Sequence, residues 1–191
     1  MVMKKVLVLL VSAFIALGSF AQTHWKIDPA HSSLNFEIAH SGISFVNGKF
    51  IDYTGDVTTY GEELDQAKIN FTVQVASINT NVEMRDNHLR SADFFEVETY
   101  PTMTFESTKI LATGRPDYYL LHGKLTIKDV TKDVIFDVCY GGTVESEEGE
   151  KIGIEAKTTI SRFDFNIDYD PMALGIGKDV SIVVHGQFEK L

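Results

Sequence analysis

The chain has 191 residues, a formal net charge of −10 and one cysteine, and 44% of its residues are hydrophobic. This length suits one domain with a single core, and one cysteine excludes an intramolecular disulfide. The acidic balance argues against nucleic acid as a partner, because a negative protein surface repels phosphate backbones.

Residues 1–21 have the composition of a signal peptide. Two lysines precede an apolar run over residues 6–17, and small residues stand at Ser19 and Ala21, the positions that a signal peptidase reads. The run is shorter than the about 20 residues that cross a bilayer, and no second such run follows it in the sequence. We therefore expect cleavage after Ala21 and an exported mature domain over residues 22–191. Loss of the two leader lysines would change the net charge from −10 to −12.

The dominant pattern in the mature chain is alternation of apolar and polar residues with a period of two, which is typical of strands with one buried face. It is clearest over residues 67–75, where five apolar residues alternate with four polar ones. Turn-forming residues such as Gly141-Gly142 separate later segments of the same kind. These segments are residues 33–38, 119–127, 134–140, 152–160 and 180–188. About eight strands with short links predict an all-β fold, either a closed antiparallel β-barrel or a sandwich.

One segment, residues 81–91, breaks the alternation and predicts a short helix. Asn81 is suited to the N-cap, and Met84 and His88 lie one helical turn apart. Pro101 favours an extended backbone at the residue before it and so ends any helix by that point. We expect a helical flap or plug between two strands.

The interior of an eight-stranded barrel is either filled by side chains or holds one small ligand. Small residues at predicted inward positions favour a ligand because they leave space: Ala67, Gly123, Ala156, Thr158 and Gly186. Apolar residues would line that space: Phe36, Ile38, Phe71, Val73, Leu121, Phe136, Val138, Ile154 and Ile182. A dry core with glycine at strand bends explains the same alternation, so periodicity alone leaves both interpretations open.

The polar residues form no recognised catalytic or metal-binding motif. The six histidines occur singly, without the spacing of metal ligands, and Cys139 lies in a strand pattern without a sign of activation. Asp86 and His88 do not share a helical face, so we expect Asp86, Arg90 and Asp93 to fix the helix by salt bridges and caps. We expect no catalytic residue, no metal and no cofactor. The alternative is an enzyme that uses His40 or His88 as an acid or base.

Five short motifs stand in order along the mature chain: Trp25-Lys26-Ile27-Asp28, His40-Ser41-Gly42-Ile43, RDNHLRSADFF over residues 85–95, GKLTIK over residues 123–128, and Ser161-Arg162-Phe163-Asp164-Phe165. Together they resemble the YceI-like family of exported polyisoprenoid-binding proteins, and the block over residues 85–95 is the specific part. Asp129 and Asn166 stand where this family usually has glycine. Both residue types tolerate a left-handed backbone, so we expect the two turns to survive.

The resemblance implies an extended lipocalin-like antiparallel β-barrel whose interior takes an isoprenoid or another long-chain apolar lipid. We therefore expect a periplasmic or secreted binding protein with a carrier, storage or transport role and no enzyme activity. The alternatives are an accessory that carries an isoprenoid quinone in redox or stress response, and a lipid-acting enzyme with a pocket histidine. A homodimer and transient contact with a membrane or a membrane protein stay open. The expected ligand-binding residues are Phe36, Ile38, His40, Phe71, Val73, Met84, His88, Phe94, Leu121, Phe136, Val138, Ile154 and Ile182.

Overall fold

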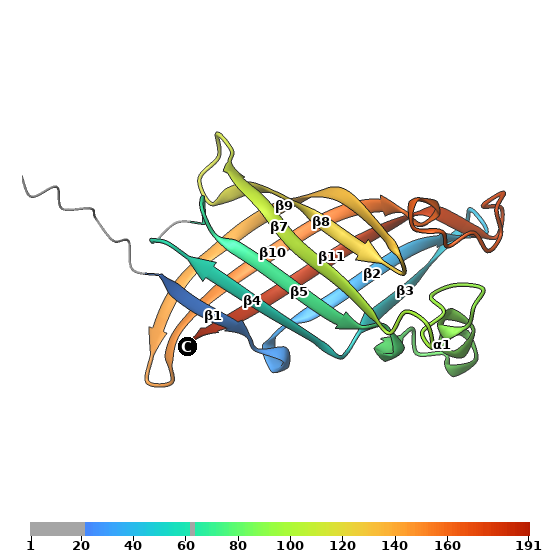
Figure 1. Ribbon diagram of the computed structural model, residues 1–191, viewed down its shortest axis with the longest axis horizontal. Coiled ribbons are helices and arrows are strands. Elements are labelled where there is room, and N and C mark those ends of the chain that lie inside the picture. The colour runs from blue at the N-terminus through green and yellow to red at the C-terminus, as the bar shows by residue number, and fades with distance from the viewer. Residues whose placement is uncertain (1–21, 62–63) are drawn as a thin grey trace, which may run out of the picture.

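Antiparallel strands close into a barrel in the computed structural model, which describes residues 22–61 and 64–191 (Figure 1). Eight strands form the ring in the order β1-β4-β5-β7-β8-β9-β10-β11, and pairing between β1 and β11 closes it. The predicted barrel of about eight strands is therefore confirmed. The predicted signal peptide over residues 1–21 lies outside the described residues. The strands are β1 (Thr23–Ile27), β2 (Ser33–His40), β3 (Ser44–Phe50), β4 (Tyr53–Thr59), β5 (Lys68–Gln74), β6 (Ile78–Asn79), β7 (Thr102–Ala112), β8 (Tyr118–Ile127), β9 (Val130–Ser146), β10 (Gly149–Ser161) and β11 (Ile176–Lys190).

Three further segments extend the ring at one end. β2 continues the direction of β1 after the 3₁₀ helix η1 (Pro29–His31), and both pair with the same edge of β11. β3 leads into β4, and β5 leads into β6 through the 3₁₀ helix η2 (Val75–Ser77). Past these bends, β6 pairs with β3 but with no other described strand, so the ladder between β5 and β7 is not continued. The barrel is therefore fully hydrogen-bonded at one end and has an open seam at the other.

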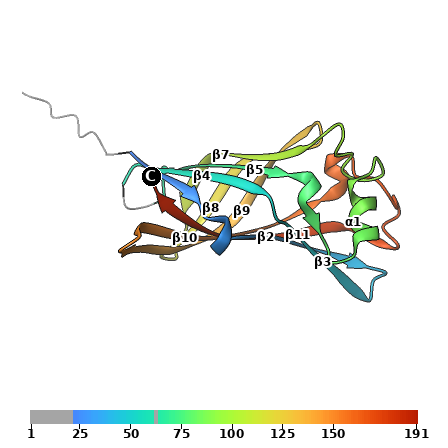
Figure 2. The same cartoon turned by 90° about the horizontal axis from the view of Figure 1, so that it is seen from below.

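The two ends carry different elements. At the end with the seam, which we call the mouth, lie the β2–β3 turn, the helix α1 (Glu83–Arg90) and the segment after the 3₁₀ helix η3 (Arg162–Phe165), as Figure 2 shows. At the opposite end, which we call the closed end, lie the β9–β10 hairpin and the last residues of β11. Buried side chains fill the closed end, including Trp25, Val57, Leu64, Val138 and Ile152. No described helix is long and apolar enough to cross a membrane.

Glycines inside the barrel are covered by aromatic rings. A Cβ built on Gly123 would lie 2.3 Å from the ring of Phe105, and one on Gly186 would lie 2.7 Å from the ring of Phe188. The inference that Gly123 leaves empty space is therefore wrong, because the ring of Phe105 rests on it. Gly186 does border a cavity, although the ring of Phe188 packs against it. Ala67 also lies in the packed core and not at a cavity, whereas Ala156 does border one.

Local predictions at the helix and the turns are confirmed in part. The predicted helix exists, but its N-cap is Val82, and Asn81 instead has a left-handed backbone with a φ of 62°. Asn166 has the expected left-handed conformation, with a φ of 55°. In the β8–β9 turn the left-handed residue is Lys128, with a φ of 56°, and not Asp129. The turn is thus formed without glycine, and its left-handed position falls one residue before Asp129.

The contact between Gly123 and Phe105 gives a stability prediction. Gly123→Ala should lower the free energy of unfolding by about 1–3 kcal/mol, because overpacking forces the ring or the strand to move. The new Cβ would also lie 2.7 Å from the carbonyl oxygen of Glu106. Gly114→Ala is the matched control, since nothing lies within 4 Å of its Cβ position. Urea denaturation measures both variants, and equal midpoints for the two would contradict the prediction.

Candidate ligand-binding cavity

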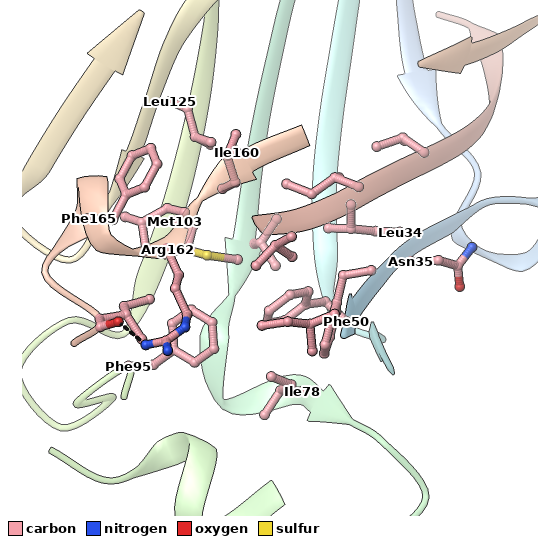
Figure 3. Close-up of a pocket in the computed structure, with 18 of the residues that line it drawn as sticks. Leu34, Asn35, Phe50, Ile78, Phe95, Met103, Leu125, Ile160, Arg162 and Phe165 are labelled. Atoms are coloured by element: carbon pink, nitrogen blue, oxygen red, sulfur yellow. Dashed lines mark hydrogen bonds between the residues drawn. The ribbon is translucent and has the colours of Figure 1, made fainter. Parts of the chain in front are cut away.

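A cavity of about 660 Å³ occupies the mouth half of the barrel. Its volume falls within the roughly 300–1,000 Å³ that is usual for small-molecule sites. Aliphatic and aromatic side chains from strands around the ring form its walls, and Figure 3 shows Leu34, Phe50, Ile78 and Met103 around a common space. Side chains of α1 and of Phe94 and Phe95 border the cavity at the mouth. The site is therefore an apolar pocket that ends against a packed core.

Twelve of the thirteen residues predicted from the sequence border this cavity. The exception is Val138, which is buried beside Tyr119 at the closed end. Phe136, two residues earlier on the same face of β9, does line the cavity. The cavity thus ends between these two positions, and the ligand-binding role of the other residues remains a prediction. The twelve are Phe36, Ile38, His40, Phe71, Val73, Met84, His88, Phe94, Leu121, Phe136, Ile154 and Ile182.

Several aromatic lining residues were missed by sequence reasoning. Phe50 lies between Phe36 and Phe95, with ring centroids 5.7 Å and 6.0 Å from theirs. Phe105 packs edge-on against Phe136 at 5.2 Å. Alternation with polar neighbours in β3 and β7 was a usable signal for Phe50 and Phe105. No periodic signal marks Phe165, because it belongs to a 3₁₀ helix and not to a strand.

Hydrogen bonds attach α1 firmly to β6. The buried carboxylate of Asp86 accepts from the backbone N of Thr80 at 2.9 Å and from its Oγ1 at 2.5 Å. Arg90 donates from Nε to the carbonyl of Ala76 at 2.8 Å and from Nη2 to the carbonyl of Ile78 at 2.9 Å. Asp86 and Arg90 therefore fix the helix, but by hydrogen bonds to backbone and hydroxyl groups, so the expected salt bridges and caps of these two residues were wrong. The helix is therefore anchored on the side of the open seam.

His88 joins α1 to the rest of the mouth. Its Nε2 lies 2.9 Å from Oδ2 of Asp93, so its acidic partner is Asp93 and not Asp86. Its ring packs edge-on against Phe94 and Tyr169, with centroids 5.0 Å and 4.9 Å away. His40 also borders the cavity, and its Nδ1 lies 3.4 Å from Oγ of its neighbour Ser41. Among the described residues, no hydrogen bond or ring contact joins His40 to His88.

Arg162 is a buried cation at the cavity wall that sequence reasoning did not assign to the site. Its side chain donates to four carbonyls: from Nε to Gly177 at 2.8 Å, from Nη1 to Ile167 at 2.6 Å, and from Nη2 to Asp170 at 3.0 Å and Ile176 at 3.1 Å. Burial lowers the pKa of the Arg162 guanidinium from its ordinary value. All of these carbonyls belong to residues 167–177, so one side chain bonds to both ends of this loop. Figure 3 shows Arg162 among the residues that line the cavity. The signal for Arg162 lay in its family motif, which gave no structural role.

A second side chain shapes the same loop. The carboxylate of Asp170 accepts from the backbone N of Gly175 at 2.7 Å and of Ile176 at 2.8 Å. These backbone hydrogen bonds hold the pKa of Asp170 below its usual range. Asp170 is therefore charged at neutral pH. We call the loop over residues 167–177, which Arg162 and Asp170 hold together, the clasp. The ring of Tyr169 in this loop borders the cavity. Among the described residues, no group of three or more His, Cys, Asp or Glu side chains could hold a metal ion.

A closed antiparallel barrel with an apolar cavity at one end is the architecture of lipocalin-like binding proteins. The chain belongs to the YceI-like domain family, whose model matches residues 25–188. It is 36% identical over 182 residues to protein YceI of Escherichia coli O157:H7, with 94% of each chain covered. The resemblance inferred from the motifs is therefore confirmed.

Solved structures show the same fold. BcnA of Burkholderia cenocepacia matches with a TM-score of 0.76 and 23% identity, over 84% of this chain and 98% of that one. A polyisoprenoid binding domain from Saccharophagus degradans, implicated in plant cell wall breakdown, matches with a TM-score of 0.68 and 17% identity, over 86% and 97% of the two chains. These likenesses establish the architecture and leave the ligand of this chain to be argued from its own cavity.

The clasp at the mouth gives a prediction for Arg162. Arg162→Met should lower the free energy of unfolding by about 3 kcal/mol, because it leaves buried carbonyls without a charged donor. Hydrogen exchange of the amides over residues 167–177 should rise in the same variant. Lys124→Met is the control: its Nζ–Oδ1 pair with Asp133, 3.2 Å apart, is exposed and should contribute no more than about 1 kcal/mol. Equal exchange in both variants would show that Arg162 does not hold the loop.

Proposed function

We propose that this protein binds an isoprenoid or another long-chain apolar lipid inside the barrel. The observation that carries the proposal is the cavity of about 660 Å³ with its apolar lining. Each 100 Å² of apolar ligand surface removed from water contributes about 2.5 kcal/mol, so a long hydrocarbon can be held without a charged contact. Membership of the YceI-like family and the likeness to a domain described as polyisoprenoid binding support this ligand class.

The distribution of polar groups gives the bound molecule an orientation. Leu121, Phe136 and Ile154 line the cavity on strands that continue into the packed closed end, so this side suits a hydrocarbon tail. Arg85 and His88 line it from α1 at the mouth, so any polar end group would lie there. An apolar tail with a polar end at the mouth therefore satisfies both regions.

Binding fits this cavity better than catalysis does. The paired groups His88 and Asp93 stand at the mouth, and their side chains are 42% and 58% exposed. Acid–base chemistry needs reactive groups that converge on a bound substrate, and the deep wall of the pocket is apolar. The family and the binding-domain neighbour point the same way.

We further propose that the protein works as a carrier outside the cytoplasm. The support is the signal-peptide pattern over residues 1–21, which directs a protein across the inner membrane. An apolar molecule needs a carrier in an aqueous compartment, because its transfer into water is unfavourable.

Ligand binding is tested by filling the cavity. Ala156→Phe places a ring in the lumen and should weaken binding of all-trans-retinol, a fluorescent isoprenoid, at least about tenfold, or about 1.4 kcal/mol. Thr159→Phe is the control, because Thr159 lies exposed on the same strand. Retinol fluorescence titration measures both variants, with thermal unfolding to show that each is folded.

The natural ligand is sought in the same preparation. Native mass spectrometry of the wild-type protein, followed by organic extraction, should show a bound hydrophobic molecule that retinol displaces. A wild-type protein that carries no hydrophobe and does not bind retinol would contradict the proposed function.

A further inference from the structure

Two neighbouring segments at the mouth carry no charged residue although the chain as a whole is 23% charged. The first is residues 41–46, SGISFV, and the second is residues 171–177, PMALGIG. Large apolar side chains point to solvent from both: Ile43 is 90% exposed, Phe45 62%, Met172 74% and Leu174 78%. We call these four side chains the mouth rim.

Hydrogen bonds hold the two segments side by side. The backbone N of Ser41 donates to the carbonyl of Gly175 at 2.8 Å, and His40 pairs with Ile176 in the ladder between β2 and β11. Figures 1 and 2 show the β2–β3 turn and the loop before β11 at the same end of the barrel. The mouth rim is therefore one surface feature built from two parts of the chain.

The mouth rim is displayed by ordered backbone. Ser41 and Gly42 have φ values of 53° and 67°, which reverse the chain tightly and place Ile43 at the tip of the turn. The clasp formed by Arg162 and Asp170 supports Met172 and Leu174 from below. The backbone that carries these side chains is therefore already ordered before another surface covers them, which lowers the entropic cost of docking.

The mouth rim is also continuous with the entrance of the cavity. Met84 of α1 is 82% exposed and borders the cavity, and Tyr169 borders it in the same loop as Met172. An apolar path thus runs from the rim to the lumen. An exposed apolar patch of this kind in a protein with a charged surface marks an interaction site.

We propose that the mouth rim docks the barrel onto the surface of a zwitterionic phospholipid bilayer, with its apolar side chains inserted among the headgroups. Docking in this orientation lets an apolar ligand move between the bilayer and the cavity without crossing water. The purpose of docking rests on the proposed function, but docking itself requires no ligand.

The charge distribution favours a zwitterionic bilayer and indicates which end of the barrel meets it. The rim segments offer no cation to attract anionic lipids, and the net charge of −10 repels them. The acidic stretch with Glu145, Glu147, Glu148 and Glu150 lies at the β9–β10 hairpin, at the opposite end of the barrel. A bilayer therefore meets the uncharged rim segments and not the acidic hairpin.

Size argues against a second copy as the occupant. A stable protein–protein interface takes about 20–30 residues from each partner. The mouth rim presents four large side chains around an opening, and two copies joined there would face each other with their cavities. A bilayer does not require a surface of that size, because it is deformable and apolar just below its headgroups.

The test compares vesicle binding of the full chain with that of a rim variant. The variant carries Ile43→Ser, Phe45→Ser, Met172→Ser and Leu174→Ser, none of which lines the cavity. Flotation with phosphatidylcholine vesicles should show at least about a tenfold loss of binding relative to wild type. Leu111→Ser with Val144→Ser is the control, since both side chains are exposed away from the mouth and should bind vesicles as wild type does.

A fluorescent reporter checks the orientation. Trp25 is the single tryptophan and is buried at the closed end, so Ile43→Trp adds one probe at the rim. Phosphatidylcholine vesicles should shift its emission to the blue, and added phosphatidylglycerol should weaken binding. No shift in this variant, or equal flotation of the wild type and the rim variant, would overturn the proposal.

Delivery of retinol separates the two proposals. The rim variant should bind retinol added from ethanol as wild type does, yet take it up from vesicles several-fold more slowly. Wild type that binds retinol but not vesicles would overturn docking and leave the proposed function standing. Wild type that binds vesicles but not retinol would overturn the proposed function and leave docking standing. Sedimentation that shows a wild-type dimer broken by the rim substitutions would assign the rim to a second copy and overturn docking.

Discussion

Closure of the barrel depends on the edge of β11, which β1 and β2 share. The bend between these two strands is fixed by the carboxylate of Asp28, which accepts from the backbone N of Ala30 at 2.9 Å and lies 2.5 Å from Nδ1 of His31. The hydrogen bond from His31 holds the pKa of Asp28 below its ordinary value, so this carboxylate is charged at neutral pH. The backbone N of Gln187 donates to Oγ of Ser32 at 2.9 Å. This side-chain acceptor gives the β11 edge a hydrogen-bond partner at the bend, where no described strand pairs with it.

The interior is packed at the closed end and hollow towards the mouth. Before the bends, the side chains of Trp25 and Val57 are buried and do not border the cavity. After them, the ladder between β5 and β7 ends and the seam is covered by α1 in place of a strand. The cavity lies at this interrupted part of the wall and also reaches back past the bends to Ile69, Phe71 and Phe188. The interrupted strands therefore border the mouth part of the cavity, and the rest of the cavity lies inside the closed ring.

Much of this fold follows from the sequence, because alternation reports directly which side chains face inward. It does not report how far along the barrel a residue lies, so Phe136 and Val138 look equivalent in sequence although only Phe136 reaches the cavity. It also cannot show that a ring covers Gly123, because Phe105 comes from a different strand. The role of Arg162 was hidden for a similar reason: its partners are backbone carbonyls, and any sequence supplies those.

The mouth is built by different forces from the rest of the barrel. The walls are joined by backbone ladders, whereas the loop over residues 167–177 is held by the side chains of Arg162 and Asp170, and α1 by those of Asp86 and Arg90. The free energy of local opening depends on the bonds that the opening breaks, so the mouth can rearrange without disturbing the ladders of the ring. Opening of the mouth therefore breaks a few side-chain hydrogen bonds at one end, while the packed closed end keeps the barrel folded.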